Sequence, residues 1–472
     1  MPLLPNRRQS LALLATAGLP AWATTATATA PTVPTARTAR TARTAPTGTA
    51  AITLAPMALR QRRLANGLQV ISLPMAGGTV SVQVWYRVGG KDDPAGRSGF
   101  AHLFEHLMFK STRHMPSEMF DRLTEDVGGQ NNAFTAEDMT AYLSEVPGNH
   151  LERLLWAEAE RLANLQVDQA NFDSERKVVI EELRQHVLAD PYGRLFNALP
   201  QYGFERHPYR RPVIGNEADL NAATLDDVRR FHATYYRPDN AVLIVVGDFD
   251  PPQLDTWVDR HFGPLRSPAT AIPRVTEREP ARAADLRVAL QAPNVPLPAL
   301  ALVWKGVAAS HPDALALEMA QALLASGESS RLNQALVYTA QTAQAAGFAA
   351  EQYADGGMLA AYAIAASGQN LRKLEDALLA QISLLARGKV GFDEIDKVRT
   401  QVLTAALLRR QTPQGQAQAI GSAALLLGDA READARITRL QAVRVADIQR
   451  VLRQHVLGAR RVSIDYTQAA AA

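Results

Sequence analysis

The chain has 472 residues, no cysteine and a formal net charge of +3. Five arginines and no acidic residue lie within residues 1–50, so the remainder carries −2 and its composition gives no support for a nucleic-acid partner. Without cysteine there are no disulfides or thiolate zinc sites, so any metal must be held by histidine and carboxylate side chains.

The amino terminus has the pattern of a bacterial export signal over residues 1–23. Arg7 and Arg8 precede an apolar run that is too short to span a membrane and ends in small residues. The paired arginines also loosely match a twin-arginine signal. Residues 24–56 are mainly Ala, Thr, Pro and Arg and are predicted to form a disordered tether. No later stretch has the length and apolarity of a membrane span, so we expect a periplasmic or secreted protein.

The chain after the tether alternates predicted strands and helices. Strands are expected within 64–73, 80–88, 139–145 and 241–247, and helices at 98–110, 117–127, 150–165, 171–187 and 224–235. Ser98 is the expected N-cap of the first of these helices. The connections carry no glycine-rich phosphate loop, so the pattern favours an α+β fold with helices on one face of a sheet.

The second half of the chain repeats the first. Matching pairs at an offset of 220 residues are Asp227 and Asp447, Arg230 and Arg450, Val242 and Val462, and Ile244 and Ile464. We therefore expect two homologous repeats, each a mostly antiparallel sheet with helices packed on one face. The predicted boundaries are 57–265 for the N-terminal domain, 266–284 for a linker rich in Pro and Ala, and 285–472 for the C-terminal domain.

The predicted helix at 98–110 carries a metal-binding pattern. His102 and His106 are four residues apart and lie on one helix face, where two imidazoles can hold one ion. Glu105 lies at the edge of that face, within reach of a metal-bound water. The pattern is H-x-x-E-H, the inverted form of the common zinc-protease motif. Two core histidines with an ion-paired glutamate are the alternative. The matching helix at 314–324 has no histidine, so only the first half is expected to bind metal.

A third ligand is needed, because catalytic zinc usually has three protein ligands and one open position. The helix at 171–187 carries clustered carboxylates on a partly apolar face. Glu175 and Glu182 are two turns apart on one stripe, whereas Glu181 points about 100° away from Glu182. A carboxylate on a buried stripe needs a charged partner, and a metal is one. Glu182 is therefore the predicted ligand and Glu175 a residue that orients a histidine. Surface pairs with Arg and Lys are the alternative.

These residues resemble the pitrilysin/insulinase family of zinc peptidases, which includes the mitochondrial processing peptidase. The resemblance covers nearly the whole chain from residue 57 onward, in family order, through the segments 64–70, 85–90, 128–135, 175–182, 207–209 and 235–241. The second half resembles the family's inactive repeat, and its clearest match is Ser329-Ser330-Arg331-Leu332.

The resemblance implies an exported zinc metallo-endopeptidase that acts on extended peptides or unfolded polypeptides. Zn²⁺ would be held by His102, His106 and Glu182, with Glu105 as the base that activates a zinc-bound water and Glu175 in support. The segment 130–135 resembles the family's edge strand, which binds peptide through main-chain hydrogen bonds. Its implied substrate-binding residues are Gln130, Asn131, Asn132, Ala133 and Phe134. A plain loop is the alternative for this segment.

One departure from the family pattern concerns the second half. In many active members the inactive repeat supplies an arginine and a tyrosine to the substrate. Arg331 is present here, but Gln344 stands where the tyrosine is expected. Either Tyr338 or Tyr353 replaces it, or another subunit supplies the pair. We therefore expect a homodimer or a heterodimer with a homologous subunit. The alternative function is a non-catalytic or partner-dependent subunit, against which the intact H-x-x-E-H motif argues.

Overall fold

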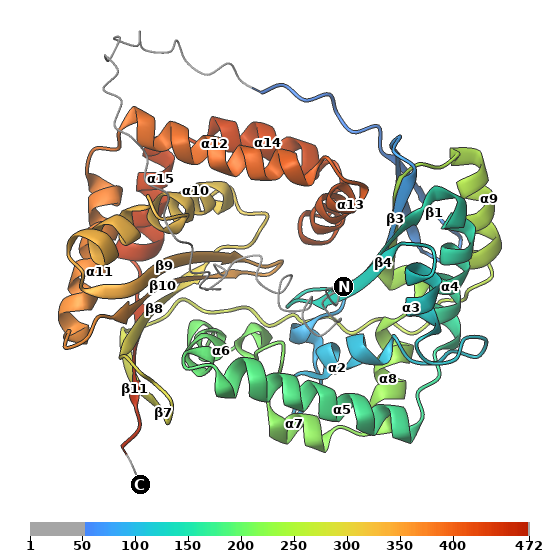
Figure 1. The fold of residues 1–472 in the computed structure, drawn as a ribbon, viewed down its shortest axis with the longest axis horizontal. Coiled ribbons are helices and arrows are strands. Elements are labelled where there is room, and N and C mark those ends of the chain that lie inside the picture. The colour runs from blue at the N-terminus through green and yellow to red at the C-terminus, as the bar shows by residue number, and fades with distance from the viewer. Residues whose placement is uncertain (1–51, 471–472) are drawn as a thin grey trace, which may run out of the picture.

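Two sheets with their helices form two halves that lie side by side (Figure 1). The computed structural model describes residues 52–470, so the predicted export signal and the predicted tether up to residue 51 lie outside the described residues. The predicted α+β class is confirmed. Across residues 52–470, no helix is both long enough and apolar enough to cross a membrane.

The first sheet has six strands in the order β1-β2-β6-β3-β5-β4. Their bounds are β1 Arg60–Arg63, β2 Gln69–Pro74, β3 Thr79–Tyr86, β4 Gln130–Thr135, β5 Thr140–Pro147 and β6 Ala241–Gly247. β2 and β6 are parallel, and the other neighbours are antiparallel. One face is covered by α2 Phe100–Leu107, α3 Met119–Glu125, α4 Leu151–Asn164, α5 Gln169–Leu183, α7 Glu217–Ala222, α8 Leu225–Tyr235 and α9 Pro251–Phe262.

The second sheet has five strands in the order β7-β11-β8-β10-β9. Their bounds are β7 Leu286–Ala292, β8 Ala299–Gly306, β9 Ala343–Gln352, β10 Gly357–Ala365 and β11 Arg461–Gln468. Helices α10 Ala314–Ala325, α11 Leu371–Arg387, α12 Phe392–Arg409, α14 Glu432–Ala442 and α15 Val445–Leu452 share its main core. β11 is parallel to β7, as β6 is to β2, so the last strand of each half has the same role.

Each half also covers the second face of the other half's sheet with one helix. α6 (Gly193–Gly203) of the first half packs through Leu195 and Leu199 on the second sheet. α13 (Pro413–Ser422) of the second half packs through Ala417 and Ile420 on the first. These helices begin 220 residues apart, at the repeat offset. The prediction of helices on one face of each sheet therefore holds for each half taken alone. In the whole chain, a helix of the other half covers the second face.

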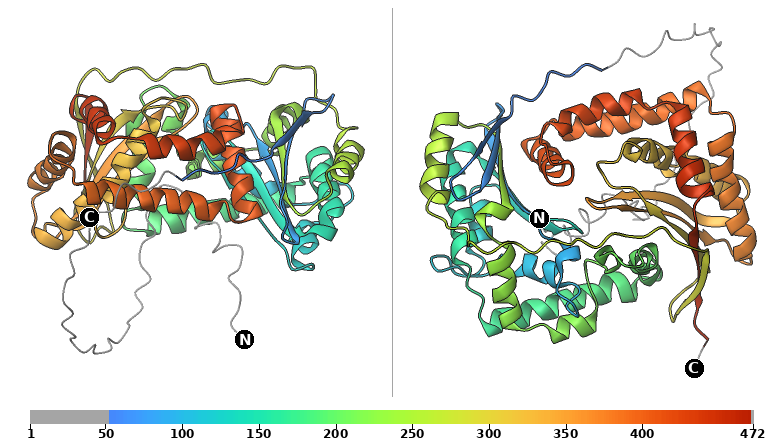
Figure 2. Two further views of the ribbon diagram at one scale, coloured as in Figure 1. Left: turned by 90° about the horizontal axis from the view of Figure 1, so that it is seen from above. Right: turned by 180° about the vertical axis from the view of Figure 1, so that it is seen from behind.

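Two extended segments also cross between the halves. The chain between α9 and β7 has no regular secondary structure and runs from one half to the other (Figure 2). At the start of the described chain, Ile52 exchanges two hydrogen bonds with the Gln441 side chain of α14, at 2.7 and 2.9 Å. The Met57 N–H donates to Asp434 of the same helix at 2.7 Å. The chain then enters β1 in the first half.

The two halves also meet where the β4–β5 turn touches the β9–β10 turn. Glu137 of the first turn is hydrogen-bonded to Tyr353 of the second. Burial, together with the neighbouring Glu351 and Asp138 carboxylates, raises the pKa of Glu137 to about 7. Burial also raises the pKa of Glu351. This contact therefore places between the halves a carboxyl that changes its protonation near neutral pH.

We expect Glu137 to make stability fall with rising pH. Its pKa is 4.5 in an unfolded chain and about 7 here. Between these values the folded protein keeps a proton that the unfolded chain has lost, so the stabilisation is complete below pH 4.5 and is lost as the pH rises through 7. Unfolding midpoints measured from pH 4.5 to 8 should fall less steeply for Glu137→Gln than for the wild type. Equal slopes would contradict this.

Candidate metal centre

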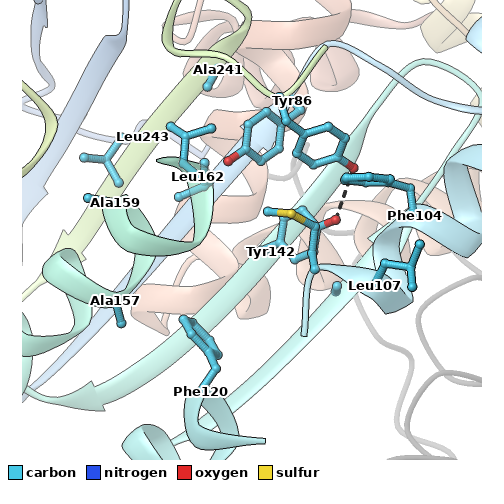
Figure 3. Close-up of a cluster of buried hydrophobic side chains, with 14 of the residues drawn as sticks. Tyr86, Phe104, Leu107, Phe120, Tyr142, Ala157, Ala159, Leu162, Ala241 and Leu243 are labelled. Atoms are coloured by element: carbon cyan, nitrogen blue, oxygen red, sulfur yellow. Dashed lines mark hydrogen bonds between the residues drawn. The ribbon is translucent and has the colours of Figure 1, made fainter. Parts of the chain in front are cut away.

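Helix α2 is held by its apolar side chains and by a buried carboxylate at its start. All its residues except His106 are buried. Figure 3 shows Phe104 and Leu107 pointing into the core cluster that contains Tyr86 and Tyr142 of the sheet. This packing fixes the helix axis and turns its polar stripe away from the core.

The predicted N-cap at Ser98 is wrong. The N-cap is Gly99, with φ +90°, and it makes no side-chain cap hydrogen bond. The buried Asp93 carboxylate accepts instead from the N–H groups of Gly99 and Ala101, at 2.8 and 2.7 Å. Glycine suits this position because its φ is left-handed and an added Cβ would lie 2.7 Å from the Ile214 carbonyl oxygen. Ser98 directs its own N–H to Asp219 at 2.9 Å.

Helix α5 brings carboxylates to α2. Asp168 caps it by accepting from the Asn171 N–H at 2.7 Å. Glu175 is buried and Glu182 is half-buried, whereas the Glu181 side chain is 57% exposed and contacts Arg184 and Gln185. The helix therefore separates Glu181 from Glu182 in the direction that the sequence predicts.

His102, His106 and Glu182 converge at one point. One ligand atom from each lies within 4.8 Å of the others. The Nε2 atoms of His102 and His106 are 3.8 and 3.6 Å from the Glu182 carboxylate. These separations exceed hydrogen-bond lengths, yet they are of the size expected when ligand atoms about 2.0–2.2 Å from one ion surround it.

The residues present fit a zinc ion. Within the described chain, the buried His106 Nε2 atom, which faces Glu182, has no hydrogen-bond partner, and an unpaired buried polar atom is costly. Burial and the neighbouring His106 lower the pKa of His102 to about 3, so its imidazole is neutral, as a metal ligand must be. Two imidazoles and one carboxylate are a usual donor set for catalytic zinc.

Glu175 contacts the ring nitrogen of His106 that faces away from Glu182. Its carboxylate lies 3.4 Å from His106 Nδ1 and 2.7 Å from Lys110 Nζ. Burial alone would lower the pKa of His106, but Glu175 together with the charges of Glu105 and Glu182 raises it. Burial likewise opposes ionisation of Glu175, but His106 and Lys110 lower its pKa overall. Lys110 was missed from the sequence; it lies three residues beyond Leu107, the last residue of α2.

Glu105 lies beside the three converging residues and is 2% exposed. The Thr135 hydroxyl at the end of β4 donates to its Oε2 at 2.6 Å. Thr135 is the last residue of the segment predicted as an edge strand, but no sequence pattern connects it with Glu105. The contact joins α2 to β4, the strand predicted to bind substrate.

The segment predicted to bind substrate forms β4, an edge strand rather than a plain loop. It pairs with β5 on one side, and its other edge has no strand partner in the described chain. Its side chains are largely used by the fold: Gln130 reaches Gln414 of α13, Asn131 donates to Thr124, and Asn132 accepts from the Ala133 N–H. Phe134 packs edge-on against Trp85. The unpaired main chain is what remains for a peptide.

Three residues of the second half were predicted as candidates for a clamp on the substrate: Arg331 with either Tyr338 or Tyr353. Their surroundings differ. Arg331 pairs with Glu394 of α12 at 2.6 and 2.8 Å. Tyr338 is 50% exposed, whereas Tyr353 is buried against the Tyr209 ring of the first half, with 4.7 Å between centroids. Gln344 is an exposed residue of β9. Within residues 52–470, the contacts of Arg331 and Tyr353 are with residues other than His102, His106 and Glu182, so a role for Arg331 stays a prediction.

Known proteins resemble this chain in sequence and in structure. A family model described as insulinase (peptidase family M16) matches residues 70–217, and one described as the peptidase M16 inactive domain matches residues 222–402. The zinc protease PqqE of Helicobacter pylori is 32% identical over 339 residues, which are 71% of this chain and 76% of that protein. The probable mitochondrial-processing peptidase subunit beta of Arabidopsis thaliana is 25% identical over 407 residues, 84% of this chain and 76% of that protein.

Solved structures agree with these matches. A crystal structure of a protease from Helicobacter pylori has a TM-score of 0.83 at 28% identity, over 87% of this chain and 99% of its own. A putative M16-like peptidase from Alicyclobacillus acidocaldarius shares the fold with a TM-score of 0.74 at 20% identity, over 88% of this chain and 100% of its own. The family models and the 32% identical zinc protease together show that this chain belongs to the insulinase family of peptidases, M16.

Proposed function

We propose that this protein is a zinc metallo-endopeptidase of the H-x-x-E-H type that hydrolyses extended or unfolded polypeptides. The observation that carries the proposal is the convergence of His102, His106 and Glu182 beside the buried Glu105. Relatives named as zinc proteases support the same metal and the same class of reaction. The second half matches a model described as inactive, so we assign the chemistry to the first half.

The residues around the site have separate roles in this mechanism. A zinc ion bound by His102, His106 and Glu182 supplies Lewis acidity, which polarises the scissile carbonyl and lowers the pKa of a water toward about 7. Glu105 accepts the proton of the attacking water and delivers it to the leaving amine. Thr135 holds the Glu105 carboxylate through its hydroxyl, and Glu175 fixes the orientation of the His106 ring.

Substrate selection follows from the free edge of β4. A peptide that adds to this edge is recognised by its main-chain N–H and C=O groups, so many sequences fit but the bound segment must be extended. A folded protein cannot offer such a segment without local unfolding. We therefore assign extended peptides and unfolded chains as substrates, with Gln130, Asn131, Asn132, Ala133 and Phe134 as the strand that receives them.

We place this activity outside the cytoplasm. The proposal rests on residues 1–23, whose charged start, apolar run and small-residue end are those of an export signal. A protein of the same fold, PqqL from Escherichia coli, is described as a periplasmic protease, although at 20% identity it supports the fold alone. Measuring where the mature chain accumulates in the cell, in the wild type and after deletion of residues 1–23, tests the assignment.

Metal removal is expected to abolish hydrolysis. The purified mature chain should cleave an unfolded protein such as casein, lose this activity with a zinc chelator, and regain it on addition of about one equivalent of zinc, because three ligands hold a single ion. A tightly folded protein of similar size serves as the matched control and should stay intact. Cleavage that continues in the metal-free chain would contradict the mechanism.

A partner-dependent subunit is the second candidate function. It is favoured by Gln344, which stands where many active members carry a tyrosine, and by the burial of Tyr353 between the halves. In this reading the chain binds zinc but needs a second copy or a homologous subunit to complete the substrate clamp. An oxyanion left without its second donor forfeits about 3 to 4 kcal/mol. Zinc-loaded chain that is inactive alone and active with such a subunit would favour this candidate.

A further inference from the structure

The turn between β4 and β5, residues 136–139, is held by contacts from three directions. Within the turn, the Ala136 N–H donates to the Met139 carbonyl at 2.8 Å. Residues Gly90 and Lys91, which follow β3, also bind the turn. Their N–H groups donate to the Ala136 and Glu137 carbonyls at 3.0 Å each. This turn begins at the residue that follows Thr135, so its placement sets where β4 ends.

Asp138 is the residue of this turn at which the contacts meet. It is 9% exposed. Its Oδ1 accepts from the Tyr209 hydroxyl at 2.5 Å and lies 2.8 Å from Lys91 Nζ. Its Oδ2 accepts from the Ala354 N–H, in the β9–β10 turn of the second half, at 2.8 Å. One buried carboxylate therefore joins three segments that are distant in sequence.

Asp355, the residue after Ala354 in the second half, contacts the same Lys91 and Tyr209 side chains as Asp138. Asp355 lies 2.7 Å from Lys91 Nζ, and its N–H donates to the Tyr209 hydroxyl at 3.1 Å. Asp355 is much more open than Asp138, because its side chain is 41% exposed. Both carboxylates thus tie the halves together, but only Asp138 belongs to the turn that follows β4.

The cluster is connected to the catalytic base by a short route along the chain. Thr135 lies three residues before Asp138 and donates to Glu105 at 2.6 Å. A hydroxyl that must stay 2.6 Å from its acceptor is sensitive to small shifts, and a displacement of about 1 Å in a catalytic group costs on the order of a hundredfold in rate. Movement of the turn therefore reaches Glu105 through Thr135.

We propose that Asp138 is a positioning residue for the reaction: it fixes the turn so that Thr135 holds Glu105, and it makes this placement depend on the docked second half. The inference rests on the proposed peptidase function. In this proposal the second half, which carries none of the three metal-binding residues, contributes to the reaction, because the Ala354 N–H donates a hydrogen bond to Asp138. A purely structural ion pair between the halves is the competing explanation, and a comparison with Asp355 separates the two.

The kinetic test compares Asp138→Ala with Asp355→Ala. In the zinc-loaded chain, Asp138→Ala should lower kcat about ten- to a hundredfold with unchanged zinc content, whereas Asp355→Ala should change kcat by less than about threefold. In a Thr135→Val background, adding Asp138→Ala should have little further effect, because residues that act through one another are not additive. Equal losses in both single variants, or additive losses in the double variant, would overturn the proposal.

A second measurement does not depend on activity. Hydrogen exchange of the metal-free chain should speed up in residues 134–140 for Asp138→Ala but not for Asp355→Ala, because the Ala136 N–H bond to Met139 opens with the turn. Asp138→Asn, which keeps one acceptor oxygen, should give an intermediate rate and is available if the alanine variant does not fold. Unchanged exchange in this segment would overturn the proposal. A wild-type chain that is inactive would instead overturn the proposed function and leave the exchange test decisive for Asp138.

Discussion

Glu105→Gln is expected to keep the fold and the zinc while it lowers peptide hydrolysis by about two to four orders of magnitude. Glutamine has the same shape and can still accept from the Thr135 hydroxyl, but it cannot take a proton from water. The three converging ligand residues are untouched. The measurement is kcat with an unfolded substrate, made together with zinc content and the unfolding midpoint, so that loss of base can be told from loss of metal or fold.

The matched control for this change is Thr135→Val, which removes the hydroxyl but leaves the carboxylate. Because the base is then misplaced rather than absent, its effect should be smaller than that of Glu105→Gln. Turnover that survives in zinc-replete Glu105→Gln would remove Glu105 from the mechanism. If the wild type itself shows no hydrolysis while binding zinc, the partner-dependent function is favoured instead.

Helix periodicity predicted which side chains of the candidate metal centre share a helix face. Spacings of four and seven residues set which side chains share a face, so His102 with His106, and Glu175 with Glu182, could be grouped without a structure. The same rule separated Glu181 from Glu182, and the structure has Glu181 exposed. The repeat at 220 residues predicted the duplication of the sheet, which the equivalent positions of β6 and β11 bear out.

Contacts between distant segments were beyond the reach of such patterns. Asp93 caps α2 in place of Ser98 because the loop before the helix folds back, and no local spacing indicates this. Thr135 reaches Glu105 across 30 residues, and α6 and α13 cover sheets of the opposite halves. In each case a side chain or face is compatible with several partners, and the tertiary arrangement of the whole chain decides which partner it meets.

The resemblance to the family does not by itself establish that Arg331 binds substrate. The residue matches a family signature, but its guanidinium forms two hydrogen bonds with the Glu394 carboxylate, which lowers the pKa of that carboxyl. A role in binding substrate would require this pair to open or to be shared. Sequence similarity predicts the residue type, whereas the partner of its side chain depends on the neighbouring helix in this chain.

Removal of one zinc ligand is expected to empty the site. The wild type should hold about one zinc per chain, and His102→Ala or Glu182→Gln should hold close to none at submicromolar free zinc, because two remaining ligands cannot fill a three-ligand site. Metal analysis of the purified, dialysed proteins measures this directly. Neither variant should unfold, since α2 is anchored by its apolar face and by Asp93.

The neighbouring carboxylates provide a graded set of controls for this result. Glu181→Gln changes an exposed side chain on the same helix and should leave zinc binding unchanged. Glu175→Gln leaves the three ligands in place but weakens the support of His106, so its zinc affinity should fall about ten- to a hundredfold. Undiminished zinc in Glu182→Gln, or loss of zinc in Glu181→Gln, would show that the third ligand is a different residue.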